Sequence, residues 1–243
     1  MAKKIAVIGA VEQEIFPLHE VLLHEPHWQR TERGTYHHPL LDLEVHTVVS
    51  GVGKVNSAYR TAELLAAFSP ELVVNIGYAG GLVPHAQPGD IVIGTDYRQI
   101  DFVSLTEGFA AGMVPGASPN IVPDRFIGTV EQVSRSLGYR FFTGRIATGD
   151  FFLNDSIRKA EIIRDFAPVA FDMESAAIAH VCAAKGVAFA VVRVLSDLAD
   201  EEAAIPLESE LADIARRPVS VVLQSLKEFY GVSADSVLKL KLS

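Results

Sequence analysis

A helix pattern followed at once by a long apolar strand pattern, between Pro168 and Asp200, constrains the fold more than any other part of this sequence. Apolar residues recur there at helical spacing and predict a helix from about Met173 to Lys185. The run from Val187 to Leu195 is almost continuously apolar and rich in β-branched residues, which is typical of a strand covered on both faces. This unit therefore predicts an α/β fold with the run inside a sheet.

Charged residues stand at the ends of this apolar unit and within it. Glu174 would lie in the first turn of the helix, where unpaired amides and the helix dipole favour a carboxylate. Arg193 interrupts the apolar run, and Ser196-Asp197 follows where the strand runs out. Strand ends carry the ligand chemistry in α/β sheets. A helix cap, a structural ion pair and a second cap explain the same residues equally well, so both interpretations stay open at this point.

Predicted strands and helices alternate along the rest of the chain. Strands are expected at Lys4–Gly9, His27–His38, Leu41–Ser50, Glu71–Gly77, Ile91–Asp96 and Arg140–Ala147. Helices are expected around Ile15–Leu22 and at Val55–Phe68, Asp124–Leu137, Ser156–Phe166 and Glu208–Tyr230, and the tail at 237–242 alternates like an edge strand. This alternation, without repeats or linkers, predicts a single three-layer αβα domain over residues 1–243, with a central mixed sheet and helices on both faces.

The segment from Asp101 to Pro123 departs from this regularity. Its glycines, prolines and scattered apolar residues, among them Phe102, Leu105 and Phe109, show no steady period. A long irregular segment within a compact domain is usually functional. So many apolar side chains need a surface to pack on, and we expect the segment to have a functional role.

Composition and charge exclude several classes of partner. A net charge of −9 argues against nucleic acid, because nucleic-acid binding depends on cations that neutralise phosphates. No apolar run approaches the length of a membrane span, and Ile5–Ala10 is too short for a secretory signal. The lone cysteine, Cys182, is explained as a core residue, and the histidines lack metal-ligand spacing. We expect a soluble cytoplasmic protein that binds no nucleic acid, membrane or metal.

Two glycine-rich stretches and a set of carboxylates are the motifs that could carry chemistry. Gly51-Val-Gly-Lys54 matches neither common phosphate-binding loop, so a tight strand-to-helix turn is the favoured explanation. Tyr78-Ala-Gly-Gly81 is explained equally well by close approach to a ligand and by turn geometry. No Gly-x-Ser-x-Gly elbow occurs, which disfavours acyl chemistry. The remaining carboxylates, Glu14, Glu174 and Asp197, suit acid–base cleavage of a carbon–heteroatom bond.

Six motifs, in order and at matching intervals, carry a resemblance to a known family. They are Ile-Gly-Ala-Val-Glu-Gln-Glu (8–14), Ser-Gly-Val-Gly-Lys-Val-Asn (50–56), Asn-Ile-Gly-Tyr-Ala-Gly-Gly (75–81), Ala-Thr-Gly-Asp-Phe-Phe (147–152), Asp-Met-Glu-Ser-Ala-Ala (172–177) and Val-Arg-Val-Leu-Ser-Asp-Leu-Ala-Asp (192–200). Over roughly Lys3 to Tyr230 the chain resembles the bacterial 5′-methylthioadenosine/S-adenosylhomocysteine nucleosidases of the nucleoside phosphorylase-like superfamily.

The resemblance implies hydrolysis of an adenine N-glycosidic bond in a small adenosine thioether, without cofactor or metal. It makes Asp197 the general acid that protonates adenine N7 and Glu14 the general base that holds the attacking water. Arg193 would orient Glu174 and the water, and Tyr78 and Ser196 are counted with the substrate-binding residues. The other implied substrate contacts are Glu174 and the Met173 backbone for the ribose hydroxyls, Phe152 and Leu153 for the purine, Gly80 close to the ligand, and Val11, Val52 and Leu207 for the 5′-alkylthio group.

The resemblance also implies a homodimer, in which the irregular segment with Phe102, Leu105 and Phe109 reaches into the neighbouring subunit's site. Two positions depart from the family pattern: Tyr78 stands where serine is usual, and Asp172 where glutamate is frequent. Tyr78 keeps open a nucleosidase for another adenosine derivative, with the ring expected to line the ribose pocket. A purine nucleoside phosphorylase and a catalytically silent nucleoside-binding relative also stay open as functions for this chain.

Overall fold

The computed structural model describes residues 2–102, 111–201 and 208–231. Its strands are β1 (Lys3–Gly9), β2 (Gln29–Arg30), β3 (Tyr36–His38), β4 (Leu43–Val49), β5 (Leu72–Gly81), β6 (Ile91–Gln99), β7 (Phe141–Thr148), β8 (Ala170–Asp172) and β9 (Ala188–Asp197). Its helices are α1 (Glu12–His24), α2 (Lys54–Phe68), α3 (Asp124–Ser136), α4 (Ser156–Phe166), α5 (Ser175–Ala184) and α6 (Glu208–Tyr230). The predicted edge strand at 237–242 lies outside the described residues.

The strands of the described residues form one mixed sheet in the order β2-β3-β4-β1-β5-β8-β7-β6-β9. β1 lies parallel between β4 and β5, and β9 lies parallel to β5. β9 also pairs with β6, and β5 also pairs with β8, so the strands from β5 to β9 close on themselves. The predicted α/β class with a central mixed sheet is confirmed.

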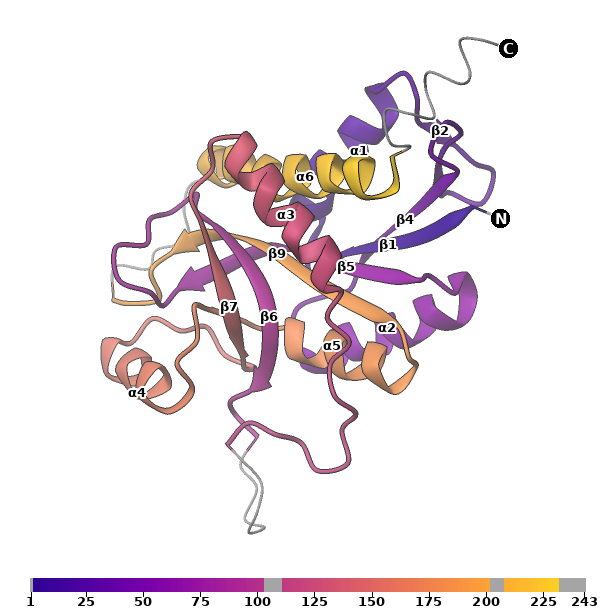
Figure 1. Cartoon of the computed structure of the whole chain (residues 1–243). Helices are drawn as coiled ribbons and strands as arrows, with labels where there is room; N and C mark the ends of the chain where they lie inside the picture. Colours follow the sequence, from indigo (N-terminus) through magenta and orange to yellow (C-terminus); the bar gives the residue numbers. More distant parts are fainter. Residues whose placement is uncertain (1, 103–110, 202–207, 232–243) are drawn as a thin grey trace.

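Helices cover both faces of this sheet, which explains why its central strands are apolar throughout (Figure 1). Val74 and Val192 point into a core shared with α1, α3 and α6, whereas Val73 and Val191 point into a core shared with α2 and α5. Successive side chains of a strand face opposite sides, so β5 and β9 need apolar residues at every position. Cys182 is fully buried in the second core. Within the described residues, no helix is long and apolar enough to span a membrane.

Several predicted boundaries are wrong, each for a local reason. The strand expected over His27–His38 is split into β2 and β3 by a turn closed by hydrogen bonds between Thr31 and Thr35, with Gly34 at a φ of +77°. β8 was not predicted, because three residues are too few to show a period. α5 begins at Ser175, so Glu174 is its N-cap residue and lies just before the first turn.

The glycines at 80 and 81 do not end β5, as their turn-like composition indicates, but extend it. Both pair with β8, and Gly80 also pairs with Asp197 of β9. A Cβ added at Gly80 would lie 2.9 Å from the Ala199 Cβ, and one at Gly81 would lie 2.9 Å from Leu195 Cδ1. Glycine at these two positions therefore lets the backbone at the end of β9 pack closely against β5. The strands β1, β5 and β9 end at the same edge of the sheet.

Candidate active site

A cavity of about 340 Å³ lies at the carboxyl ends of β1, β5 and β9. Such an edge is where α/β folds place ligands. The predicted site residues that line it are Val11, Glu14, Val52, Tyr78, Gly80, Phe152, Leu153, Met173, Glu174, Ser196 and Asp197. The structure thus brings together residues from the whole length of the chain around one concave, largely apolar surface.

Glu14 is fixed in the first turn of α1 by backbone amides. Its Oε2 accepts from the amides of Ala10 at 2.5 Å and Val11 at 3.2 Å, and its Oε1 accepts from the amide of Tyr78 at 2.8 Å. The side chain is 4% exposed. Burial raises the pKa of Glu14, although Arg193 and the three amides oppose this shift. The carboxylate is therefore rigidly placed, and its charge costs more here than in water.

Arg193 is fully buried, and three carboxylates surround its guanidinium. Its Nη2 lies 2.8 Å from Asp172 Oδ2 and 3.1 Å from Glu174 Oε2, and its Nη1 lies 3.7 Å from Glu14 Oε1. The Nε and Nη1 atoms have no hydrogen-bond partner within the described protein atoms. Burial disfavours the charged guanidinium, but Asp172, Glu174 and Glu14 together raise the pKa of Arg193 above its ordinary value. This arginine stays charged and organises the carboxylates.

Glu174 contacts Arg193 on one side and the turn before α2 on the other. Its Oε1 accepts from the amide of Gly53 at 3.0 Å, and its side chain makes no cap hydrogen bond to α5. Asp172 instead accepts from the amides of Glu174 and Ser175. The pKa of Glu174 is raised to about 7, mainly by burial; Arg193 opposes this shift and the Asp172 charge adds to it. Glu174 thus stands at the N-cap position of α5, but its side chain does not cap the helix and belongs to the cluster around Arg193.

Sequence reasoning missed two residues of this cluster, Asp172 and Gly77. Asp172 is buried, and its Oδ1 accepts from the Thr148 hydroxyl at 2.6 Å, while its Oδ2 contacts Arg193 and the Ser175 hydroxyl. A Cβ added at Gly77 would overlap Glu14 Oε1 and would lie 2.5 Å from Arg193 Nη1. Gly77 also has a φ of +144°, which side-chain-bearing residues rarely adopt. Because Gly77 has no side chain, the Glu14 carboxylate and the Arg193 guanidinium can approach each other at this position.

Asp197 is the last residue of β9 and lines the same cavity. Its Oδ2 accepts from the Ser196 hydroxyl at 2.7 Å, and its Oδ1 accepts from the amide of Ala199 at 2.8 Å. Burial raises the pKa of Asp197, and these two hydrogen bonds oppose the shift. A carboxyl group whose neutral form is favoured can serve as a proton donor near neutral pH.

The ring of Tyr78 borders the cavity, but its hydroxyl is bound elsewhere. The hydroxyl donates to the Leu211 carbonyl, in α6, at 3.1 Å. Burial, and secondly the Glu14 charge, raise the pKa of Tyr78 to about 12, so the phenol remains a donor. The hydroxyl therefore does not take the place of a serine hydroxyl beside the sugar, and whether the ring contacts ribose stays a prediction.

The remaining predicted residues are placed as follows. Leu153 is buried in the lining, while Phe152 and Val52 are exposed by 52% and 46% at the cavity mouth. Phe102 is half-buried just after β6 and does not line the cavity of its own chain. Leu105, Phe109 and Leu207 lie outside the described residues.

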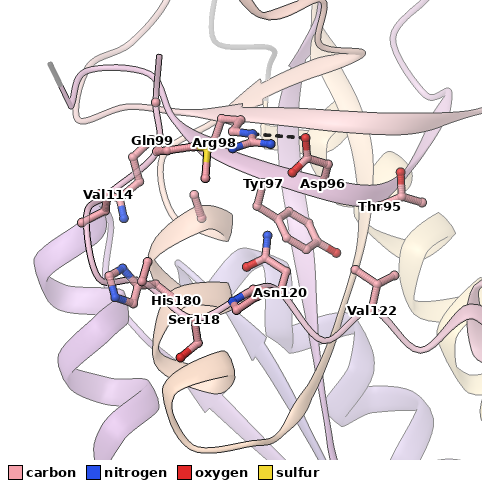
Figure 2. Close-up of a pocket in the computed structure, with 15 residues that line it drawn as sticks. Thr95, Asp96, Tyr97, Arg98, Gln99, Val114, Ser118, Asn120, Val122 and His180 are labelled. Carbon is pink, nitrogen blue, oxygen red and sulfur yellow. Dashed lines mark hydrogen bonds and ion pairs between the residues drawn. The ribbon is translucent and has the colours of Figure 1, made fainter. Parts of the chain in front are cut away.

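A second cavity, of about 470 Å³, lies between β6, the segment 112–122 and α5 (Figure 2). None of the predicted site residues that the structure describes lines it. Its two lining charges are engaged with each other, since Asp96 Oδ2 accepts from Arg98 Nε at 3.2 Å (Figure 2). Asp96 Oδ2 also accepts from Nε of Arg145, outside the lining, at 2.5 Å. The smaller cavity, with two separate carboxyl environments, is the one equipped for acid–base chemistry.

Comparison with known proteins shows which family the chain belongs to. The model of the phosphorylase superfamily matches residues 4–229. A 5′-methylthioadenosine/S-adenosylhomocysteine nucleosidase from Actinobacillus succinogenes is 36% identical over 227 residues, which are 93% of this chain and 99% of the relative. The nucleosidase of the same name from Neisseria meningitidis, solved in complex with methylthio-immucillin-A, has a TM-score of 0.82 and 34% identity, with 93% of this chain and 99% of that chain covered.

A third similar protein has a different name. The native structure of futalosine hydrolase from Helicobacter pylori matches with a TM-score of 0.81 and 27% identity, covering 94% of this chain and 99% of that chain. The fold is thus common to several enzymes, and the sequence identities point to one family among them. The chain belongs to the 5′-methylthioadenosine/S-adenosylhomocysteine nucleosidases of the phosphorylase superfamily.

The two departures from the pattern of this nucleosidase family both line the cavity. Asp172 is part of the buried cluster, where its short side chain still reaches Arg193 at 2.8 Å. Tyr78 lies at the cavity wall and connects β5 to α6. Asp172 keeps the negative charge of the frequent glutamate, whereas Tyr78 replaces the usual serine with a large ring.

Proposed function

We propose that this chain hydrolyses the N-glycosidic bond of 5′-methylthioadenosine and S-adenosylhomocysteine, releasing adenine and a 5-thio-substituted ribose. The observation that carries the proposal is the pair of carboxyl groups on one cavity, buried Glu14 and half-buried Asp197, with different hydrogen-bond partners. Glycoside hydrolysis needs an acid for the leaving group and a base for water, on either side of an oxocarbenium-like sugar.

Asp197 is the proposed general acid. As the C1′–N9 bond breaks, its electron pair moves into the purine, and Asp197 supplies the proton that adenine takes up at N7. Burial raises the pKa of Asp197, which favours the protonated form that can donate. Ser196 and the amide of Ala199 stabilise the carboxylate that remains.

Glu14 is the proposed general base. Water adds to C1′ of the sugar cation and passes a proton to Glu14, so that the free ribose carries a new hydroxyl. The Arg193 Nη1 atom, which lies 3.7 Å from Glu14 Oε1 without a hydrogen-bond partner in the described protein, is placed to bind the same water. Glu174 would accept from the ribose hydroxyls while its position is kept by Gly53 and Arg193.

The remaining predicted contacts follow the shape of the cavity. Phe152 and Leu153 lie on its lining between β7 and α4 and are proposed to hold the purine. Val11 and Val52 are apolar lining residues suited to an alkylthio group. No metal or cofactor enters this proposal, and cytoplasmic location stays a prediction from composition.

Hydrolysis is favoured over phosphorolysis by the placement of cations. Among the described residues that line the cavity, none is lysine or arginine. Arg193 is engaged by three carboxylates, and Lys54 Nζ is bound to Asp101 Oδ1 at 2.6 Å. A phosphate co-substrate would need cations placed for it.

A panel of 5′-substituted adenosines, assayed for adenine release with and without phosphate, tests this function. We expect release from methylthioadenosine and adenosylhomocysteine at rates independent of phosphate. Strict phosphate dependence would establish a phosphorylase, and tight adenine binding without turnover would establish a silent relative. A second candidate, a nucleosidase for another adenosine derivative, is supported by Tyr78 and by the similarity to futalosine hydrolase, and release from only that derivative would establish it.

The proposal includes a homodimer. Val55 and Tyr59, on the first turns of α2, are exposed by 79% and 63%, close in sequence to the exposed lining residue Val52. Exposed apolar groups that gather beside a cavity mark a protein interface. Sedimentation should give the mass of two chains, and Val55→Asp should lower the mass to that of one chain. A wild-type protein that sediments as a fully active monomer would contradict this proposal.

A further inference from the structure

Lys54, at the end of the Gly51-Val-Gly-Lys54 turn, has no role in the proposed chemistry and is part of a closed ring of contacts. The Lys54 amide donates to Asp150 Oδ1 at 2.8 Å, and the Asp150 amide donates to Asp101 Oδ2 at 2.9 Å. Lys54 Nζ completes the ring by donating to Asp101 Oδ1 at 2.6 Å. Each of the three residues thus contacts the other two, although they come from distant parts of the sequence.

Each segment joined by this ring supports a different part of the cavity. The amide of Gly53, next to Lys54, donates to Glu174 Oε1 at 3.0 Å. Asp150 is followed directly by Phe151, Phe152 and Leu153, which line the cavity. Gly53 also fits closely against Asp150, because a Cβ at 53 would lie 3.1 Å from Asp150 Oδ1. The ring therefore connects the support of Glu174 with the loop proposed to hold the purine.

The ion pair in the ring differs from an ordinary surface pair. The side chains of Lys54 and Asp101 are only 18% and 23% exposed. Burial raises the pKa of Asp101, but the Lys54 hydrogen bond and the Asp150 amide outweigh it, so the pKa is lowered overall. Isolated exposed pairs contribute little, whereas charge-assisted hydrogen bonds that share partners act together.

We propose that Lys54 is a positioning residue which, through Asp101 and Asp150, couples the ribose-binding carboxylate Glu174 to the purine-binding loop at 150–153. This inference rests on the proposed function for the meaning of the two subsites. Lys54 touches neither reacting atoms nor the lining, so its removal should weaken substrate binding and leave the chemical step nearly intact.

The test compares Lys54→Met with Lys227→Met. Lys227 binds both oxygens of Glu25 at 2.7 and 2.8 Å, between the C-terminal parts of α6 and α1, and is a matched ion pair away from the cavity. For Lys54→Met we expect KM for methylthioadenosine to rise about 10- to 100-fold, as for loss of a hydrogen bond to a charged group, with kcat within about threefold. Lys54→Arg, which keeps the charge, should recover part of the loss.

Hydrogen–deuterium exchange supplies a readout that needs no substrate. Peptides covering 50–56 and 149–153 should both exchange faster in Lys54→Met and in Asp101→Asn, and neither should change in Lys227→Met. Failure of the wild type to release adenine would refute the proposed function, while exchange would still decide the coupling. Unchanged exchange in both peptides, or faster exchange in 50–56 alone, overturns the inference. If Lys54→Met does not fold, Asp101→Asn decides by the same criteria.

Discussion

The two carboxyl groups proposed for catalysis occupy opposite kinds of environment. Glu14 lies beside the Arg193 guanidinium, in the same buried cluster as Asp172 and Glu174. Its carboxylate accepts hydrogen bonds from three backbone amides. Asp197 accepts one hydroxyl and one amide at a strand end. Burial raises both pKa values; Arg193 and three amides oppose the shift at Glu14, whereas one hydroxyl and one amide oppose it at Asp197. The two groups therefore differ in the neighbours that favour their ionised forms, and such differences separate a base from an acid.

Removing the acid should give the largest effect. Asp197→Asn keeps the size of the side chain but has no carboxyl proton for the leaving base. We expect turnover to fall by up to about 10,000-fold, the upper end for general acid catalysis. Binding of methylthioadenosine, measured by calorimetry, should persist. Turnover close to that of the wild type would show that Asp197 is not the acid.

Removing the base should give the next largest effect and sharpen the contrast. Glu14→Gln retains hydrogen-bonding capacity but cannot take a proton from water. We expect turnover to fall about 1,000-fold, within the range for general base catalysis, while adenine, which needs no water, binds as before. Both quantities can be measured on one preparation. An equal loss of adenine affinity would assign Glu14 a structural role.

The sequence could predict that Glu14 and Asp197 belong to one site, but not which residues support them. Asp197 stands where an apolar strand runs out, and strand ends collect ligand chemistry, so its place was readable. Gly77 and Asp172 were not readable, because their roles depend on where the Glu14 and Arg193 side chains end in three dimensions. Likewise, Gly80 and Gly81 have the composition of a turn, and only pairing with β8 and β9 shows them to be strand.

The third variant changes a charge in the cluster around Arg193 and leaves Asp197 unaltered. Asp172→Asn removes a negative neighbour that raises the pKa of Glu174, so that pKa should fall below about 7. The acid limb of the pH profile of kcat/KM should then move to lower pH. Since Arg193 loses a charged partner, the maximum of kcat/KM should also fall about 10- to 100-fold. Asp172→Glu should restore most activity.

A remote pair provides the control for this pH shift. Asp90 accepts two hydrogen bonds from Arg140, at 2.6 and 2.9 Å, and Asp90→Asn should leave the limb unmoved. The raised pKa of Glu174 also makes the stability of the fold depend on pH. Since the folded-state pKa is above the ordinary value of 4.5, the contribution of Glu174 to stability is largest below pH 4.5 and is lost as pH rises through about 7. The thermal midpoint should therefore fall between pH 5 and about pH 8, and less steeply in Asp172→Asn.

Tyr78 lies near both carboxyl groups proposed for catalysis. Its amide donates to Glu14, and its ring borders the cavity that Asp197 also lines. Its hydroxyl binds the Leu211 carbonyl, so the phenol connects the cavity wall to the first turns of α6. The amide contact belongs to the backbone and survives any substitution. Only the connection to α6 and the volume of the ring can be changed, and neither belongs to the acid or the base.

Tyr78→Phe should therefore give the smallest effect. Loss of one neutral hydrogen bond is expected to lower stability by about 1 kcal/mol and to change kcat/KM by only a few-fold. Tyr78→Ser removes the ring as well, and should shift preference among 5′ substituents toward larger groups. Tyr230→Phe, whose hydroxyl binds Glu71 at 2.9 Å far from the cavity lining, is the matched control. Should Tyr78→Ser keep the wild-type order of substrates across the panel, the ring would be a packing element, and specificity would be determined by other residues of the cavity wall.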